Sequence, residues 1–316
     1  DEPIADWVCV PLYYVSKLAR DSGVTVVQVG EGADEQFCGY ESWMRYLQAY
    51  DWFWNSYNRI IPLPVRRTIG AIANNLVSYP RNKRAQIAES LLRSGCGREL
   101  FWSGANSFWN VHKNKIFNTI DATGPWEDLV GMGFEITGLS DHDSGAIVDG
   151  YFANFDKEYP CQDFLTRMIF LEFRQRLPEL LLMRVDKITM STSVEARVPF
   201  LDHHLVEYSM NIPQASKIRG RNTKAILKLA LKGIIPDEII NRPKMGFSAP
   251  VSDWLKGDLG FEVESSLLSS PLVKDGALKR RPITEMISAH RSGQGDHALH
   301  LWTLYNLTAW HDQWLC

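Results

Sequence analysis

Three carboxylates stand close together in the chain, directly after a short run of β-branched residues. They belong to Glu31, Asp34 and Glu35. The valine-rich run, residues 24–29, is typical of a buried strand, and Gly30 and Gly32 allow a tight turn with a close backbone approach to a ligand. Ligands of open α/β sheets bind at the carboxyl ends of strands, and acids this close repel one another unless cations or a metal compensate them. The turn is therefore a candidate ligand site, although a solvated acidic turn explains the acids alone about equally well.

A second group of charges lies in and after an apolar helical run, residues 164–191. Charged side chains embedded in such a run must be paired or placed at a site. The group consists of Arg184, Asp186, Lys187, Glu195 and Arg197. Mutual pairing is the competing interpretation, and it has more weight for Arg184 and Asp186 than for Glu195 and Arg197, which lie beside a Val-Pro-Phe turn. Pro178, inside the run, is expected to kink or restart the helix.

A third group contains a lysine whose backbone is held on both sides. Lys244 stands between Pro243 and Gly246, so its ammonium can be fixed in place to stabilise a phosphate or a developing anion. A surface lysine is the alternative. Just before it, residues 223–232 are expected to form a basic amphipathic helix with a solvated lysine face. The face consists of Lys224, Lys228 and Lys232.

These three regions carry the motifs of one family. Residues 30–40, which read Gly-Glu-Gly-Ala-Asp-Glu-Gln-Phe-Cys-Gly-Tyr, resemble the second signature of the asparagine synthetase B family, Ser-Gly-Glu-Gly-x-Asp-Glu-x-Phe-x-Gly-Tyr. Residues 183–191 and 194–202 are similar to its Arg-x-Asp-Lys and Glu-x-Arg-x-Pro-Phe-Leu-Asp patterns, and residues 242–247 to its Arg-Pro-Lys-x-Gly-Phe pattern. Because the three matches occur in the family's order, the resemblance covers most of the chain.

The resemblance implies a fold and a reaction. The fold of the family's synthetase domain is of the adenine-nucleotide hydrolase-like, or PP-loop pyrophosphatase, type, a helix-rich α/β domain with a doubly wound parallel sheet. The reaction is ATP-dependent amide formation. A carboxylate, usually that of aspartate, attacks the α-phosphorus of ATP, pyrophosphate leaves with Mg²⁺, and ammonia from glutamine then attacks the acyl-adenylate.

The resemblance also implies roles for individual residues. Glu31 would be the general base that takes a proton from the cationic tetrahedral intermediate formed by ammonia attack, kept ionised beside metal and lysine. Asp34 would be a magnesium ligand, and Lys244 would neutralise phosphate or transition-state charge. Gly30 and Gly32 would let the backbone approach the nucleotide. The remaining candidates, for substrate contact or for holding the site together, are Glu35, Arg184, Asp186, Glu195 and Arg197.

Two parts of the family's pattern are absent from the 316 residues: the pyrophosphate-gripping Ser-Gly-Gly-x-Asp-Ser loop and the N-terminal glutaminase domain. Val29 also stands where the family usually has a serine. We therefore expect residues 1–316 to be part of a synthetase domain in a longer polypeptide, with its first strands missing, and this chain alone to be inactive. The alternatives are a relative that amidates another carboxylate, such as a polysaccharide precursor or a small metabolite, and a catalytically inactive binding subunit.

The composition argues against several other classes of protein. The chain has 34 basic and 37 acidic residues, a formal charge of −3, so no basic surface indicates nucleic acid, and no apolar run reaches the length of a membrane span. Five scattered cysteines without a Cys-x-x-Cys pair fit a reducing cytoplasm better than disulfides or a zinc site. The triplet Asp141-His142-Asp143 could bind a metal, but such a loop is more often solvated. A homodimer is the candidate assembly.

Apolar spacing predicts helices at residues 11–20, 66–76, 83–92 and 302–314. An aromatic-rich helix is expected at residues 41–60, with its rings on one face, as is typical of a core or a partner interface. The rings belong to Trp43, Tyr46, Tyr50, Phe53 and Tyr57.

Overall fold

A small parallel sheet lies beside the candidate turn. Strand β1 (Val26–Gln28) pairs in parallel with β2 (Glu195–Arg197), with Val26 opposite Glu195 and Gln28 opposite Arg197. The predicted strand is confirmed, but the prediction that it is buried is wrong. Val24 and Val26 are 40% and 41% exposed, because β2 is the only strand beside β1 in the described part of the chain.

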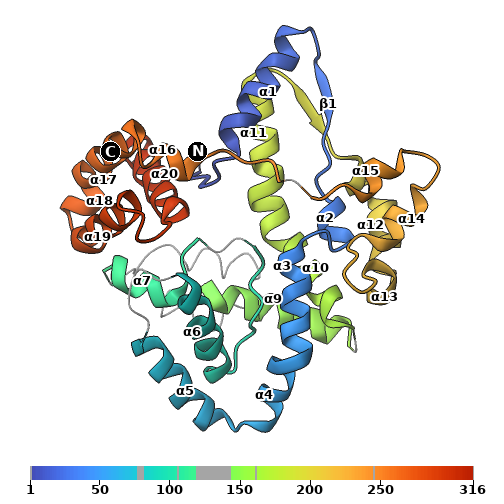
Figure 1. The fold of residues 1–316 in the computed structure, drawn as a ribbon, viewed down its shortest axis with the longest axis horizontal. Helices are drawn as coiled ribbons and strands as arrows, with labels where there is room; N and C mark the ends of the chain where they lie inside the picture. Colours follow the sequence, from blue (N-terminus) through green and yellow to red (C-terminus); the bar gives the residue numbers. More distant parts are fainter. Residues whose placement is uncertain are drawn as a thin grey trace.

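The computed structural model describes residues 2–76, 82–104, 107–118, 144–160, 162–244 and 246–315. Its architecture is helix-rich α/β (Figure 1). The first half contains α1 (Cys9–Asp21), α2 (Ala33–Gln36), α3 (Glu41–Ala49), the π-helix η1 (Tyr50–Trp54), α4 (Asn55–Ile60), α5 (Leu63–Leu76), α6 (Asn82–Gly95), α7 (Asn110–Ile116) and α9 (Ser144–Glu158). The middle contains α10 (Phe164–Arg174), the π-helix η3 (Leu177–Leu182), α11 (Met183–Ser191), the 3₁₀ turn η4 (Pro199–Leu201), α12 (His203–Met210), α13 (Gln214–Lys217), α14 (Ala225–Ala230) and α15 (Asp237–Asn241). The last part contains α16 (Val251–Trp254), α17 (Asp258–Ser269), α18 (Pro271–Lys274), α19 (Arg280–Arg291) and α20 (Ala298–Trp314).

Each strand of the sheet is entered from a helix. Helix α1 leads into β1, α11 leads into β2, and the two helices pack against each other (Figure 1). Because the strands are parallel, their carboxyl ends lie at the same edge, where the backbone N–H of Val29 donates to the carbonyl of Arg197 at 2.9 Å. The acidic turn therefore starts at the edge where ligands of parallel sheets bind.

The apolar run before β2 is broken as predicted. Helix α10 ends at Arg174, and Gln175 leaves the helical conformation with φ −125° and ψ −85°. Pro178 then lies in the first turn of η3, where its missing N–H costs no helical hydrogen bond. The restart positions Arg176 and Arg184 on consecutive segments that face the turn after β1.

The aromatic helix is only partly a core element. Trp43 is buried and its ring packs on Phe101, while Tyr50 stacks on Phe164 at 3.9 Å between ring centroids. From Tyr50 to Trp54 the helix is of the π type, which shifts the angular position of the side chains that follow, and α4 resumes the α-helical geometry at Asn55. Phe53 is 42% exposed and its ring stacks on that of Tyr57, so the aromatic face continues past Tyr50 but lies outside the core there.

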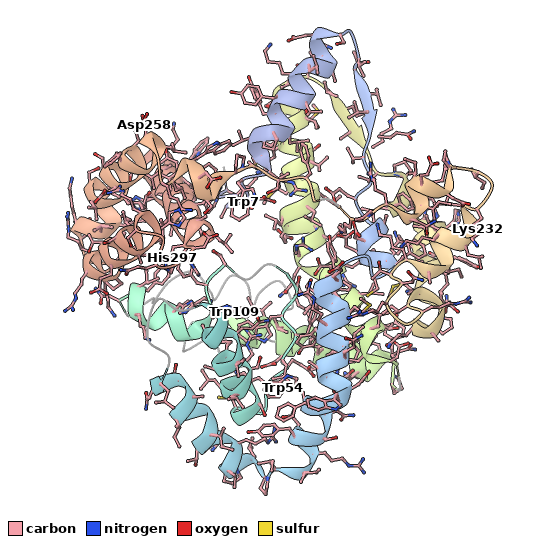
Figure 2. All side chains as sticks on the ribbon, viewed as in Figure 1. Trp7, Trp54, Trp109, Lys232, Asp258 and His297 are labelled. Carbon is pink, nitrogen blue, oxygen red and sulfur yellow. The ribbon has the colours of Figure 1, made fainter. Side chains whose placement is uncertain are left out.

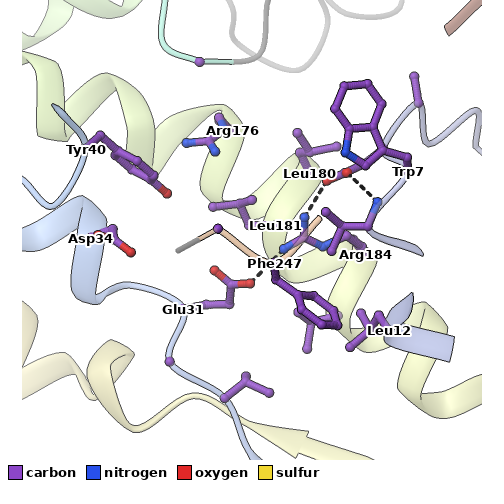
Figure 3. Close-up of a pocket in the computed structure, with 18 of the residues that line it drawn as sticks. Trp7, Leu12, Glu31, Asp34, Tyr40, Arg176, Leu180, Leu181, Arg184 and Phe247 are labelled. Carbon is purple, nitrogen blue, oxygen red and sulfur yellow. Dashed lines mark hydrogen bonds and ion pairs between the residues drawn. The ribbon is translucent and has the colours of Figure 1, made fainter. Parts of the chain in front are cut away.

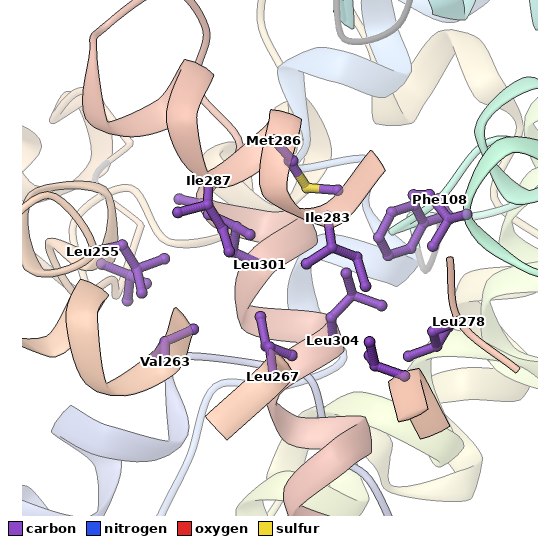
Figure 4. Packing of buried hydrophobic residues seen from close by; sticks show 14 residues of the cluster. Phe108, Leu255, Val263, Leu267, Leu278, Ile283, Met286, Ile287, Leu301 and Leu304 are labelled. Atoms are coloured by element: carbon purple, nitrogen blue, oxygen red, sulfur yellow. The ribbon is translucent and has the colours of Figure 1, made fainter. Parts of the chain in front are cut away.

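Two large buried clusters hold the described part of the chain together, beside a small one around Ala85 and Ala88. One lies among α3, α9 and α10 and includes Trp43, Phe152 and Met168. The other joins the C-terminal helices and continues into α7 and the segment before it (Figure 4). Its members include Leu267, Ile283 and Leu304, and Trp7 packs on it from the N-terminal segment (Figure 2). The segment that carries Trp7 is thereby anchored between the C-terminal helices and α11.

Buried histidines lie at the contact between α7 and the C-terminal helices. His112 of α7 is 0% exposed, and its ring centroid lies 5.6 Å from that of His300 in α20, which is 5% exposed. The ring centroid of His297 lies 5.9 Å from that of His300. Burial lowers the pKa of His112 and of His300 to about 4 in each case, so both rings are neutral near pH 7.

The remaining helix predictions are confirmed with small changes. Helices α1, α5, α6 and α20 occur at the expected places. The expected basic helix is shorter than predicted, since α14 covers Ala225–Ala230 and Lys224 precedes it with φ +53°. Within the described ranges, every helix is too short or too polar to cross a membrane.

Candidate active site

A cavity of about 700 Å³ opens at the carboxyl end of β1 (Figure 3). Its walls come from the N-terminal segment, α1, the acidic turn, η3, α11 and the loop before α16. Five predicted site residues line it, namely Gly30, Glu31, Asp34, Arg184 and Lys244. Apolar side chains, among them Trp7, Leu12 and Phe247, form much of the remaining wall. The structure therefore brings together residues from three separate regions of the sequence.

Backbone geometry explains one of the two glycines of the turn. Gly32 has φ +94°, and a Cβ on it would lie 2.4 Å from a methyl carbon of Leu201. Gly30 has neither constraint, because no atom lies within 4 Å of the place that a Cβ on it would occupy. Glu35 is 1% exposed; one oxygen accepts the N–H of Gly32 at 2.9 Å and the other accepts the hydroxyl of Tyr40. Glu35 thus stabilises the turn through these two hydrogen bonds, and it does not line the cavity.

Asp34 lies between two ammonium groups. Its Oδ1 is 2.8 Å from Nζ of Lys244 and 2.9 Å from Nζ of Lys224. Burial tends to raise the pKa of Asp34, but the two lysines outweigh it and hold the pKa below its ordinary value. The approach of Lys224 requires Gly39, because a Cβ there would lie 1.7 Å from Oδ1 of Asp34 and 2.3 Å from Cε of Lys224.

Glu31 is paired with an arginine, whereas the motif predicted a lysine beside it. Nη2 of Arg184 donates to Oε1 of Glu31 at 2.8 Å, and Nη1 contacts the carboxylate of Asp6 (Figure 3). Burial raises the pKa of Glu31 above its ordinary value; Arg184 opposes this rise and Glu35 adds to it. The ionised form of Glu31 is therefore supported by one guanidinium that it shares with Asp6.

A second arginine completes the cationic side of the cavity. Arg176 donates to the fully buried Glu172 at 2.5 Å, and its guanidinium lies 4.9 Å from the ring centroid of Tyr40. Nζ of Lys244 lies 4.3 Å from the same ring. Tyr40 thus contacts both cations through its ring and holds Glu35 through its hydroxyl. Burial raises the pKa of Tyr40, so the phenol stays protonated and remains a donor.

Besides Gly32 and Glu35, which support the turn, three further candidates lie away from the cavity wall. Glu195 and Arg197 pair with each other at 2.8 Å on β2, where both side chains are more than half exposed. Their mutual pairing, which the sequence left as the less favoured interpretation, is what the structure places there. Asp186 is exposed on α11, two residues beyond Arg184, and is not a wall residue.

Sequence reasoning missed four residues that the structure brings to the site. Lys224 was expected on a solvated helix face, but it precedes α14 in a left-handed conformation and reaches Asp34. Arg176 and Asp6 are reached only through tertiary contacts, so no local pattern indicates them. Tyr40 did carry a signal, because it closes the acidic motif quoted above.

The protein side chains at this site can bind Mg²⁺ only together with phosphate oxygens and waters. Protein-bound Mg²⁺ commonly takes one or two carboxylates together with substrate phosphates and waters. Across the described ranges, no group of three or more His, Cys, Asp or Glu side chains is placed to hold a metal ion. Asp34 is a single carboxylate already in contact with two lysines, so it fits a metal that phosphates bring with them and not one held by protein alone. The Asp141-His142-Asp143 triplet lies outside the described residues.

Comparison with known proteins identifies the class to which this fold and site belong. The family model for asparagine synthase matches residues 1–312. The chain belongs to the asparagine synthase family, and the resemblance seen in its motifs is confirmed.

Individual relatives agree along most of the chain. A protein of Mycobacterium tuberculosis (strain ATCC 25618 / H37Rv), provisionally named a glutamine-hydrolyzing asparagine synthetase, is 32% identical over 319 residues, which cover 98% of this chain and 42% of the relative. Glutamine-hydrolyzing asparagine synthetase 1 of Bacillus subtilis (strain 168) is 27% identical, with 98% and 44% covered. Amidase chyE of Penicillium rubens is 27% identical, with 78% and 35% covered. The chain therefore spans less than half the length of these relatives. No solved structure matches it.

Proposed function

We propose that the chain is part of an enzyme that converts a carboxylate to an amide, with ATP activating the carboxylate as an acyl-adenylate. One observation carries the proposal: Glu31, Asp34 and Lys244, the last of them far along the chain, line one cavity at the carboxyl end of β1. Membership of the asparagine synthase family supports the same reaction class.

The activation step needs cations around phosphates. An oxygen of the acceptor carboxylate attacks the α-phosphorus of ATP, the bond to the bridging oxygen breaks, and pyrophosphate leaves. Lys244 binds the phosphates, exchanging its contact with Asp34 for them. Asp34 would hold Mg²⁺ that arrives with the nucleotide, and this ion would supply charge neutralisation for the leaving pyrophosphate. Gly30 and Gly32 let the backbone of the turn approach the nucleotide.

The amide-forming step needs a base. Ammonia attacks the acyl carbon and forms the C–N bond, which leaves a positive charge on nitrogen. Glu31 accepts one N–H proton, after which the C–O bond breaks and AMP leaves with its electrons. Burial raises the pKa of Glu31, and the contact with Arg184 opposes this rise and so favours the ionised carboxylate that a base requires.

Aspartate is the first candidate acceptor and glutamine the first candidate source of ammonia, because the two most extensively matched relatives described above are named as glutamine-hydrolyzing asparagine synthetases. Another carboxylate, such as a polysaccharide precursor or a small metabolite, is the second candidate, since relatives named as amidases also match. We further propose that residues 1–316 are one part of a synthetase domain with a doubly wound sheet of the PP-loop type, in a cytoplasmic protein for which a homodimer is the candidate assembly.

The test is ATP–pyrophosphate exchange by the full-length protein, measured with aspartate and with a panel of other carboxylates. Exchange that requires aspartate supports the first acceptor, and exchange that requires another acid supports the second. If no acid supports exchange, and an AMP analogue does not bind with Mg²⁺ at millimolar concentration, the enzyme proposal is wrong and an inactive binding subunit remains.

The role of Glu31 has its own test. The substitution Glu31→Gln keeps the size and hydrogen-bonding capacity of the side chain but removes the base. We expect ammonia-dependent amide formation to fall about a hundredfold or more while pyrophosphate exchange falls much less. Equal loss of both partial reactions would mean that Glu31 is structural or binds metal.

A further inference from the structure

A row of three charged side chains leads from the N-terminal segment into the cavity. It runs from Asp6 through Arg184 to Glu31 (Figure 3). We infer that Asp6 is a positioning residue for Glu31, acting through the guanidinium of Arg184. The inference rests on the proposed role of Glu31 as the base of the amide-forming step.

The geometry holds Asp6 and Arg184 on two sides each. Oδ1 of Asp6 accepts the backbone N–H of Val8 at 2.9 Å, at the start of α1. Its other oxygen contacts Nη1 of Arg184, while Nη2 of the same guanidinium donates to Glu31 at 2.8 Å. The guanidinium is planar and rigid, so fixing one nitrogen sets the direction of the other. Asp6 therefore aims Arg184 at Glu31.

Burial strengthens the electrostatic effect of Arg184 on Glu31. The side chain of Arg184 is 9% exposed, that of Asp6 16% and that of Glu31 23%. Water screens charges poorly at such places, so the row behaves as one unit of two carboxylates around one cation. Because Arg184 serves both acids, neither receives its full positive charge. Asp6 thus controls how strongly Arg184 favours the ionised form of Glu31.

Several other titratable side chains lie around Glu31. Glu35 and Asp34 come from α2, Arg176 from the segment before η3, and Lys244 from the loop before α16. The Cys9 thiol of α1 lies near Asp6 and Arg184; burial, aided by Asp6, raises its pKa to about 11, so it is neutral at pH 7. None of these contacts both Asp6 and Glu31 as Arg184 does in the described part of the chain.

Two substitutions should move the titration of Glu31 in opposite directions. In Asp6→Asn, Arg184 keeps its charge but loses one carboxylate, so Glu31 should give up its proton at lower pH. In Arg184→Met, burial and Glu35 are no longer opposed, so Glu31 should give up its proton at higher pH. General loosening of the fold would expose Glu31 in both variants and move both in the same direction.

The direct measurement is NMR titration of full-length protein labelled with ¹³C at the glutamate carboxyl carbons. The Glu31 signal is assigned by its loss in Glu31→Gln. Opposite shifts in Asp6→Asn and Arg184→Met are expected, with Asp6→Glu close to wild type because it restores the charge. Asp21→Asn is the control, since it removes an exposed acid at the other end of α1. An unchanged Glu31 titration in Asp6→Asn, or shifts in one direction for both variants, overturns the inference.

The pH profile of ammonia-dependent amide formation is the second readout. Its acid limb should move to lower pH in Asp6→Asn and to higher pH in Arg184→Met, with about a tenfold fall in kcat for the latter and little change in KM for the acceptor. If the wild-type protein forms no amide but the NMR shifts occur as expected, the proposed function fails and the coupling of Asp6 to Glu31 stands. If amide forms and the NMR shifts are absent, the positioning role fails alone.

Discussion

Acidification should weaken the attachment of α7 to the C-terminal helices. His112 and His300 are buried side by side at this contact, and burial lowers the pKa of each from 6.5 to about 4. The unfolded chain therefore binds more protons than the folded chain between these two values. The stability that the two rings contribute is complete above pH 6.5 and is lost progressively as the pH falls towards 4.

The magnitude follows from the two pKa values. Between pH 7.5 and pH 5, one such histidine changes the unfolding equilibrium by a factor of about 30, or about 2 kcal/mol. The two histidines together give about 4 kcal/mol, a large share of the roughly 5–15 kcal/mol that stabilises an ordinary domain.

The assay is urea unfolding of the protein at several pH values from 7.5 to 5, followed by tryptophan fluorescence. The double substitution His112→Gln with His300→Gln should lower stability at pH 7.5 but flatten its decline with pH. Substitution of His204, an exposed histidine far from this contact, is the control and should leave the decline unchanged. The reasoning is refuted if wild type and the double variant lose the same free energy between pH 7.5 and pH 5.

Three further changes test other parts of the structure. Gly32→Ala should destabilise the protein by about 1–3 kcal/mol because of its positive φ and a close methyl carbon, whereas Gly30→Ala, with open space around it, should not; equal changes in thermal midpoint would contradict this. Lys244→Met should lower pyrophosphate exchange by about tenfold or more, with Lys244→Arg partly active; normal exchange in the methionine variant would exclude a role in phosphate binding. Replacing Glu195 or Arg197 by alanine should change stability by less than about 1 kcal/mol, because their ion pair is exposed; a larger loss on urea unfolding would show that the pair is coupled to something else.

The sequence predicts the central part of the site well because local signals were strong there. A strand followed by a glycine-framed acidic turn is a short-range pattern, and the structure places that turn at the wall of the cavity. Arg184 and Lys244 were singled out because charge in an apolar run, or beside a proline and a glycine, requires an explanation. Both lie in the same cavity as the turn.

The parts that the sequence did not predict depend on contacts between distant segments. Lys224 has the spacing of a solvated helix face, yet its left-handed backbone turns it towards Asp34, and only Gly39 leaves room for the contact. Glu195 and Arg197 share a motif with the site residues, but alternation along β2 and mutual pairing keep them at the surface. The burial expected for β1 depended on neighbouring strands, which a local pattern does not reveal.

The open edge of β1 has a consequence for handling the protein in solution. In the described part of the chain, β2 covers one edge of β1, and Val24 and Val26 expose apolar surface on the strand itself. Free N–H and C=O groups along such an edge are a template for pairing with another chain. We expect this strand to set the concentration at which the isolated chain self-associates. The substitution Val26→Lys should raise that concentration, because a charged side chain on an edge strand opposes further pairing.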